Sequence, residues 1–128
     1  MIDALDLARA AAVAADDKGG RDVVVLDVSK ILTIADAFVI VSAGNTRLVA
    51  AVAEEVEEQL AALHDVRPNA VEGLDARRWV LLDYGDIIVH VFLDEERTYY
   101  RLERLYGDAP RIEWSGASSN ATMPPTGP

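Results

Sequence analysis

The chain has 128 residues and no cysteine, and its 22 acidic against 12 basic side chains give a formal net charge of -10. The length fits one domain with a single core, and the lack of cysteine excludes disulfides, thiolate catalysis and cysteine-ligated zinc and favours a reducing, cytoplasmic setting. The acidic balance disfavours direct contact with nucleic acid, because phosphate contacts use lysine or arginine, and it suits a basic protein partner or simply solubility.

The N-terminal segment predicts a helix. Residues 3 to 17 are rich in alanine, with apolar side chains at helical spacing, and Gly19-Gly20 end the pattern. Asp3 and Asp6 occupy positions at which a signal or transit peptide would carry basic residues, and no apolar run approaches the ~20 residues that cross a bilayer. We therefore expect neither export by an obvious signal nor a membrane span.

Two short apolar runs follow, Val23 to Leu26 and Phe38 to Ser42, and both are typical of buried strands. The first run leads into a polar pair, Asp27 and Ser29. Such a pair at a strand end can bind a ligand, but a local turn in which both side chains bond to backbone is the more common arrangement.

The loop Ser42 to Thr46 joins the second strand to a helix predicted at 46 to 63, with Asn45 or Thr46 as its N-cap. Backbone N–H groups at a helix start favour an anion, so this loop is the best candidate site for a nucleotide-binding or nucleotidyltransferase-like enzyme. Nucleotidyl transfer also needs paired carboxylates that hold magnesium near the loop, and that pair is missing. The next acids lie on the helix and predict a solvated face rather than a metal site. They are Glu54, Glu55, Glu57 and Glu58.

The stretch from Trp79 to Phe92 predicts a β-hairpin with Asp83-Tyr84-Gly85-Asp86 as its turn, after an irregular segment at 64 to 77. A tip centred on Tyr84-Gly85 places Trp79 opposite His90. Both faces of the hairpin are then apolar, so we expect both to be covered by other parts of the protein or by a partner. One face carries Trp79, Leu81, Ile88 and His90, and the other carries Val80, Leu82, Ile87 and Val89.

A last helix is predicted from Asp94, as its cap, to about Tyr106, with Gly107 as the C-cap glycine. The segment 110–128 is rich in proline, serine and glycine and should be largely disordered, which leaves residues 1–109 as one domain. The order of the elements predicts an α/β or α+β fold with a single mixed β-sheet flanked by helices.

Catalytic groups are few. A Ser-His-Asp site built from Ser29 or Ser42 with His90 is disfavoured, because no serine lies in a nucleophile-elbow pattern and a histidine within a strand better suits a structural hydrogen bond. Asp83 and Asp86 could face a cation at the hairpin tip, but turn formation is the more common role of such residues. We therefore expect no enzymatic activity, no cofactor and no metal site.

Several motifs occur in order along residues 2 to 109: Asp27-Val28-Ser29, Ala35-Asp36 before Phe38-Val39-Ile40, the Ser42 to Thr46 loop, Val71-Glu72-Gly73, the block from Trp79 to Phe92, and Arg97-x-Tyr99-Tyr100-x-Leu102-Glu103-x-Leu105-Tyr106. With these motifs the chain resembles the ribosomal silencing factor family, also called Iojap. The block from Trp79 to Phe92 is the most specific of them. Small departures occur at Ala37, at Ala43 to Asn45 and at Tyr106, and the residues beyond Pro110 have no counterpart in the shorter members.

The resemblance implies a small α/β fold related to nucleotidyltransferases but without their catalytic carboxylates, and a role that is not enzymatic. Members of the family bind ribosomal protein fourteen of the large ribosomal subunit, on the face that meets the small subunit. They thereby block formation of the full ribosome and lower translation when nutrients are scarce, and they are often homodimers when free. The chain is thus expected to be a translational repressor with little direct nucleic-acid contact.

We expect docking to combine aromatic anchors, which supply affinity, with carboxylates, which set the register. The alternative for Trp79 and Leu81 is burial beneath the protein's own C-terminal helix, and for His90 it is a structural hydrogen bond. The predicted partner-binding residues lie on the hairpin and the C-terminal helix: Trp79, Leu81, Asp83, Tyr84, His90, Tyr100, Glu103 and Leu105.

Overall fold

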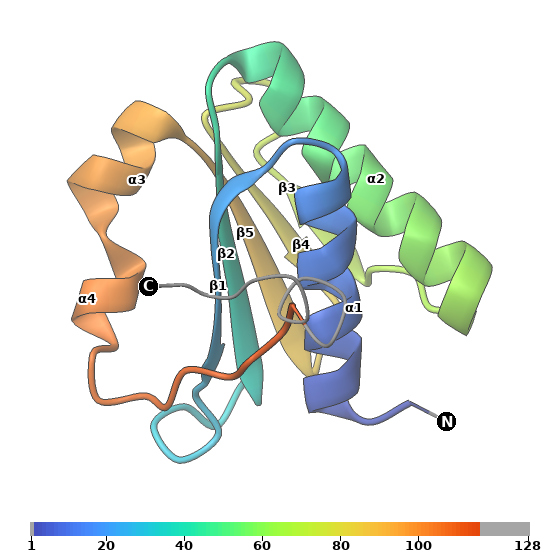
Figure 1. Cartoon of the computed structure of the whole chain (residues 1–128), viewed down its shortest axis with the longest axis vertical. Helices are drawn as coiled ribbons and strands as arrows, with labels where there is room; N and C mark the ends of the chain where they lie inside the picture. Colours follow the sequence, from blue (N-terminus) through green and yellow to red (C-terminus); the bar gives the residue numbers. More distant parts are fainter. Residues whose placement is uncertain (1, 116–128) are drawn as a thin grey trace, which may run out of the picture.

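The computed structural model describes residues 2–115 and has a five-stranded mixed sheet with helices on both faces (Figure 1). The strand order is β1-β2-β5-β4-β3, and only the β2–β5 pair is parallel within the described residues. The predicted mixed sheet flanked by helices is therefore confirmed. The elements are α1 (Ala4–Asp17), β1 (Arg21–Asp27), β2 (Ala37–Ala43), α2 (Thr46–His64), β3 (Ala70–Glu72), β4 (Trp79–Asp83), β5 (Ile87–Leu93), α3 (Asp94–Tyr100) and α4 (Leu102–Leu105).

Helices α1 and α2 form one covering layer and begin at polar caps. The side chain of Asp3 accepts a hydrogen bond from the Asp6 N–H, and that of Asn45 accepts one from the Leu48 N–H at 2.8 Å. Each cap satisfies a backbone donor that the first turn of a helix leaves free. Gly19, with φ of 100°, directly follows the C-cap residue of α1. These two predicted helices are confirmed to within a residue at each end. No helix within residues 2–115 is long and apolar enough to cross a membrane.

The two central strands, β2 and β5, are buried along their whole length. Alternate side chains of these strands, such as Val39 and Val89, pack with α1 and α2 in the larger core cluster. The intervening ones, such as Ile40 and Phe92, belong to a smaller cluster on the α3 and α4 side. The expectation that the hairpin is covered on both faces is confirmed for β5, since each face of the sheet has its own helical layer, whereas Trp79 and Leu81 on β4 stay partly exposed.

The predicted register of the β4–β5 hairpin is wrong by two residues. Trp79 lies opposite Phe92, and Leu81, not Trp79, lies opposite His90. The reason is the tip: Gly85, with φ of 87°, takes the first of the two tip positions instead of the second, and the Tyr84 N–H donates to the Ile87 carbonyl at 2.9 Å. A shift of two residues preserves the alternation, so the side chains assigned to each face are unchanged.

Two further expectations need correction. The segment 64 to 77 contains a short strand, β3, which pairs antiparallel with β4. The single C-terminal helix is two helices, because Arg101 adopts the left-handed conformation with φ of 47° between α3 and α4. Helix α3 has no side-chain cap from Asp94, and α4 ends with Tyr106 as its C-cap residue, one position before Gly107.

The segment after Ala109 lies against β1. The Asp27 N–H donates to the Pro110 carbonyl at 2.9 Å, the Ile112 N–H to the Val25 carbonyl at 2.8 Å, and the Trp114 indole N–H to the Val23 carbonyl at 3.1 Å. Residues 110 to 115 therefore extend the pairing of an edge strand. Residues 116–128, the rest of the predicted tail, lie outside the described residues.

Candidate docking surface

An aromatic cluster lies between the sheet and helices α3 and α4. Its rings meet edge to face, tilted or stacked, and those of Phe38 and Tyr106 are perpendicular with 5.3 Å between centroids. Such pairs contribute beyond the area that they bury. The aromatic cluster consists of Phe38, Trp79, His90, Phe92, Tyr100 and Tyr106.

Trp79 is half-buried and lies between two rings of this cluster. Its centroid is 4.7 Å from that of Tyr100 and 4.8 Å from that of Phe92. Its indole N–H donates to Nδ1 of His90 at 3.1 Å. Trp79 and Leu81 both pack on the smaller core from its edge, so the structure gives each of them a buried side and an accessible side.

His90 is 5% exposed, and burial lowers its pKa to about 4. At neutral pH the ring is therefore uncharged, with Nδ1 accepting from Trp79 and the proton on Nε2. The structural hydrogen bond expected for His90 is present. The serines considered as its catalytic partners are bonded elsewhere: the Ser29 hydroxyl donates to Asp27, and the Ser42 hydroxyl accepts from Arg97.

The accessible side of this layer exposes large apolar side chains. Tyr99 is 80% exposed, Tyr100 44% and Leu105 70%, and they lie on the two helices that stand apart on this side of the sheet (Figure 1). Exposed apolar groups gathered on one face are typical of a protein-binding site. We call Trp79, Leu81, Tyr99, Tyr100 and Leu105 the docking surface. Tyr99 was not selected from the sequence, although its position beside Tyr100 in the C-terminal motif was a usable signal.

Two predicted site residues lie elsewhere or have another partner. Tyr84 is 8% exposed and packs in the larger core on the α1 and α2 side, where burial, with a smaller contribution from Glu57, raises the pKa of its hydroxyl. The structure does not bring it together with Trp79. The Asp83 carboxylate accepts from the Gly85 N–H at 2.8 Å, which is the turn-forming role predicted for it.

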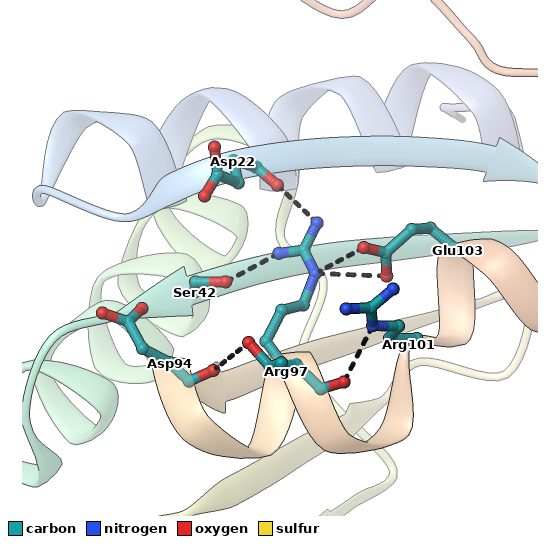
Figure 2. Close-up of polar contacts among 7 residues, drawn as sticks. Asp22, Ser42, Asp94, Arg97, Arg101 and Glu103 are labelled. Carbon is teal, nitrogen blue, oxygen red and sulfur yellow. Dashed lines mark hydrogen bonds and ion pairs between the residues drawn. The ribbon is translucent and has the colours of Figure 1, made fainter.

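Glu103 is engaged by a buried arginine that sequence reasoning did not select (Figure 2). Arg97 is 9% exposed, and its Nε donates to both carboxylate oxygens of Glu103 at 3.2 and 3.1 Å. Its Nη1 donates to the Ser42 hydroxyl and its Nη2 to the Asp22 carbonyl, each at 2.8 Å. The available signal was an arginine at the start of the C-terminal motif; its partners on β1 and β2 are visible only in the fold.

Two polar side chains of the loop proposed for an enzyme bond to the protein's own groups. Ser42 is 2% exposed and bonded to Arg97, and Asn45 caps α2. At the other predicted polar site, the Ser29 hydroxyl and N–H both donate to Asp27 and lower the pKa of that carboxyl, as expected for a local turn. Residues 2–115 contain no group of three or more histidine or acidic side chains placed to hold a metal ion.

Comparison with known proteins decides the family. The model of the family "Ribosomal silencing factor during starvation", RsfS, matches residues 1–126. The chain belongs to this family. It is 45% identical over 100 residues to the ribosomal silencing factor of Bacillus subtilis, which covers 78% of this chain and 84% of that protein. It is 41% identical over 114 residues to that of Halalkalibacterium halodurans, covering 89% and 97% respectively.

A solved structure agrees with this assignment. The crystal structure of a protein from Chromobacterium violaceum matches with a TM-score of 0.79 and 30% identity, and the match covers 94% of this chain and 100% of that one. The resemblance to the silencing factors that the motifs predicted is therefore confirmed. The names of these relatives describe silencing of the ribosome and not an enzymatic reaction. The class of function of this silencing factor is translation regulation at the ribosome.

Proposed function

We propose that this silencing factor binds the large ribosomal subunit through its ribosomal protein fourteen and sterically prevents the small subunit from joining. The observation that carries the proposal is the docking surface, an exposed apolar face on an acidic member of the silencing-factor family. The identity of the partner comes from the resemblance. So does the homodimer in the free state, whereas the cytoplasmic location follows from the lack of cysteine; both belong to the same proposal.

The chemistry of the docking surface suits a basic protein. Interfaces draw most of their affinity from a few aromatic anchors set in an apolar centre, and Trp79 with Tyr100 provides such a centre. The net charge of -10 favours encounter with a positively charged partner and disfavours contact with the surrounding phosphates. A patch of ~800 Å² on each partner is sufficient for specific binding.

The proposed mechanism needs no chemistry. A protein of 13.9 kDa bound on the joining face occupies volume that the small subunit must enter. Repression then depends only on the lifetime of the complex relative to subunit joining. Hydrolysis, a cofactor and a conformational change are not required.

The test is a subunit-joining assay. Wild-type protein should sediment with purified large subunits and slow their association with small subunits in light scattering. Trp79→Ala and Tyr100→Ala should each lose most of both effects, because each removes an anchor of the docking surface. Circular dichroism and thermal unfolding show whether the variants are folded. A folded Trp79→Ala, Tyr100→Ala double variant that still blocks joining would refute the proposed surface.

A further inference from the structure

Arg97 differs from the other arginines of residues 2–115 because its side chain is buried. Its guanidinium reaches three other elements: the Asp22 carbonyl on β1, the Ser42 hydroxyl on β2 and the Glu103 carboxylate on α4 (Figure 2). Within the described residues, Glu103 is its only charged partner. A buried cation with a single counter-ion holds that counter-ion firmly, because losing it leaves an uncompensated charge.

The bond between Arg97 and Glu103 spans the break between α3 and α4. At the break, Arg101 has φ of 47°, which is unfavourable for a residue with a Cβ and persists only where surrounding contacts impose it. The Arg101 N–H donates to the Arg97 carbonyl at 3.0 Å, so the same residue that binds Glu103 also closes the last turn of α3. The side chain and backbone of Arg97 together determine how the chain turns at this point.

The helical residues of the docking surface lie on either side of this turn. Tyr100 immediately precedes Arg101 and packs on Trp79, whereas Leu105 follows on α4. A change in the angle between α3 and α4 would move Tyr100 relative to Trp79. It would also move Leu105 relative to Tyr100 and Trp79. The relative placement of these three side chains therefore depends on the contact between Arg97 and Glu103.

We propose that Arg97 is a positioning residue for the docking surface, which it arranges by holding Glu103 across the Arg101 turn. The inference rests on the proposed function and assigns Glu103 a different role from the direct contact predicted from the sequence. Both of its carboxylate oxygens lie within 3.2 Å of Arg97 Nε, so its charge is paired within the protein although its side chain is 24% exposed. Glu103 acts on the partner through Arg97 and Tyr100.

A double-mutant cycle distinguishes positioning from direct contact. Binding to purified large subunits is measured for Arg97→Met, Glu103→Gln and the double variant. Each single change should weaken binding about tenfold, and the double variant should bind no more weakly than Arg97→Met, because both break one contact. Effects that multiply, giving about a hundredfold loss, would show that Glu103 contacts the partner independently and would overturn the inference.

The salt dependence of the kinetics gives a second readout. Glu103→Gln should raise the rate constant of dissociation from large subunits. The dependence of its association rate constant on ionic strength should have the same slope as that of Glu54→Gln. Glu54 is exposed on α2, on the opposite face of the sheet, so its variant controls for the loss of one negative charge. A clearly shallower slope for Glu103→Gln than for the control would place Glu103 in direct electrostatic contact with the partner.

A measurement on the free protein separates this inference from the proposed function. In a Trp114→Phe background, Trp79 is the only tryptophan, and its near-ultraviolet circular dichroism reports the packing of Tyr100 on it. Glu103→Gln and Arg97→Lys, both milder than Arg97→Met, should reduce this signal while unfolding stays cooperative. An unchanged signal overturns the inference even if wild-type protein binds large subunits. If the variants show a reduced signal but wild-type protein does not bind large subunits, the proposed function is refuted and the inference about Arg97 is not.

Discussion

The indole N–H of Trp79 donates to Nδ1 of His90 at 3.1 Å, across the hairpin that carries the centre of the docking surface. This bond needs an unprotonated Nδ1 and orients the ring that Tyr100 covers. Protonation of His90 would turn the acceptor into a donor. The position of Trp79 and the charge state of His90 are therefore coupled.

We expect the free energy of unfolding to decrease as the pH is lowered, because of His90. Burial lowers its folded-state pKa to about 4, below the ordinary value of 6.5, so the unfolded state binds more protons between these two values. The contribution of the uncharged His90 ring to the free energy of unfolding is complete above pH 6.5. It is lost as the pH falls towards 4, and the total loss is about 3 kcal/mol. Urea unfolding at several pH values measures the slope.

The control for this prediction uses both histidines of the chain. His90→Gln keeps a hydrogen-bond acceptor for Trp79 without a titrating ring and should flatten the pH dependence between 6.5 and 4. His64→Gln should leave the steep fall in place, because His90 is still present. If the free energy of unfolding has the same slope against pH in wild type and in His90→Gln, the pH dependence does not come from His90.

Leu105 and Leu63 form a matched pair for testing where the partner binds. They are 70% and 69% exposed, on α4 and at the end of α2 respectively. Replacement of either by alanine should change the free energy of unfolding by no more than about 0.5 kcal/mol, since neither is in the core. Leu105→Ala should weaken binding to large subunits by about 1 to 2 kcal/mol, and Leu63→Ala should not. The reverse order would move the interface to the α2 face.

Gly73 should be the most sensitive glycine near the docking surface. Its φ is 90°, and a Cβ placed there would lie 2.0 Å from the carbonyl oxygen of Trp79, at the start of β4. Because the obstacle is backbone, Gly73→Ala should cost at least ~2 kcal/mol of unfolding free energy and shift Trp79. Gly44→Ala is the comparison, as its Cβ would meet the end of the exposed Arg21 side chain, not backbone, at 3.3 Å. Equal stability of the two variants would argue against this account.

Asn45 tests whether the Ser42 to Thr46 loop serves the fold or a ligand. Its side chain accepts from the Leu48 N–H, so Asn45→Ala should lower the free energy of unfolding by about 1 kcal/mol, and Asn45→Ser should restore most of it. Binding to large subunits should be unaffected. Millimolar ATP with magnesium should not raise the melting temperature of wild-type protein, and a rise that Asn45→Ala abolishes would support the nucleotide-binding alternative.

Much of the fold could be predicted because it depends on neighbouring residues. Alanine spacing and the caps Asp3 and Asn45 define α1 and α2, and the alternation of β4 and β5 assigns each side chain to a face even with the register off by two. The turn role of Asp83 is likewise local. Such features arise from interactions within a few residues, so the sequence carries their whole cause.

The docking surface depended on contacts between distant parts of the chain. Arg97 binds groups 55 and 75 residues away along the sequence, and no local pattern indicates which side chain a buried arginine will meet. Tyr84 was predicted to bind the partner but packs in the larger core, in the layer opposite to that of Trp79. The sequence by itself determined most of the elements, the faces of the hairpin and the family. Only the tertiary structure decided that Glu103 is bound by Arg97 and that the helix turns at Arg101, since both involve one buried charge that meets three other elements.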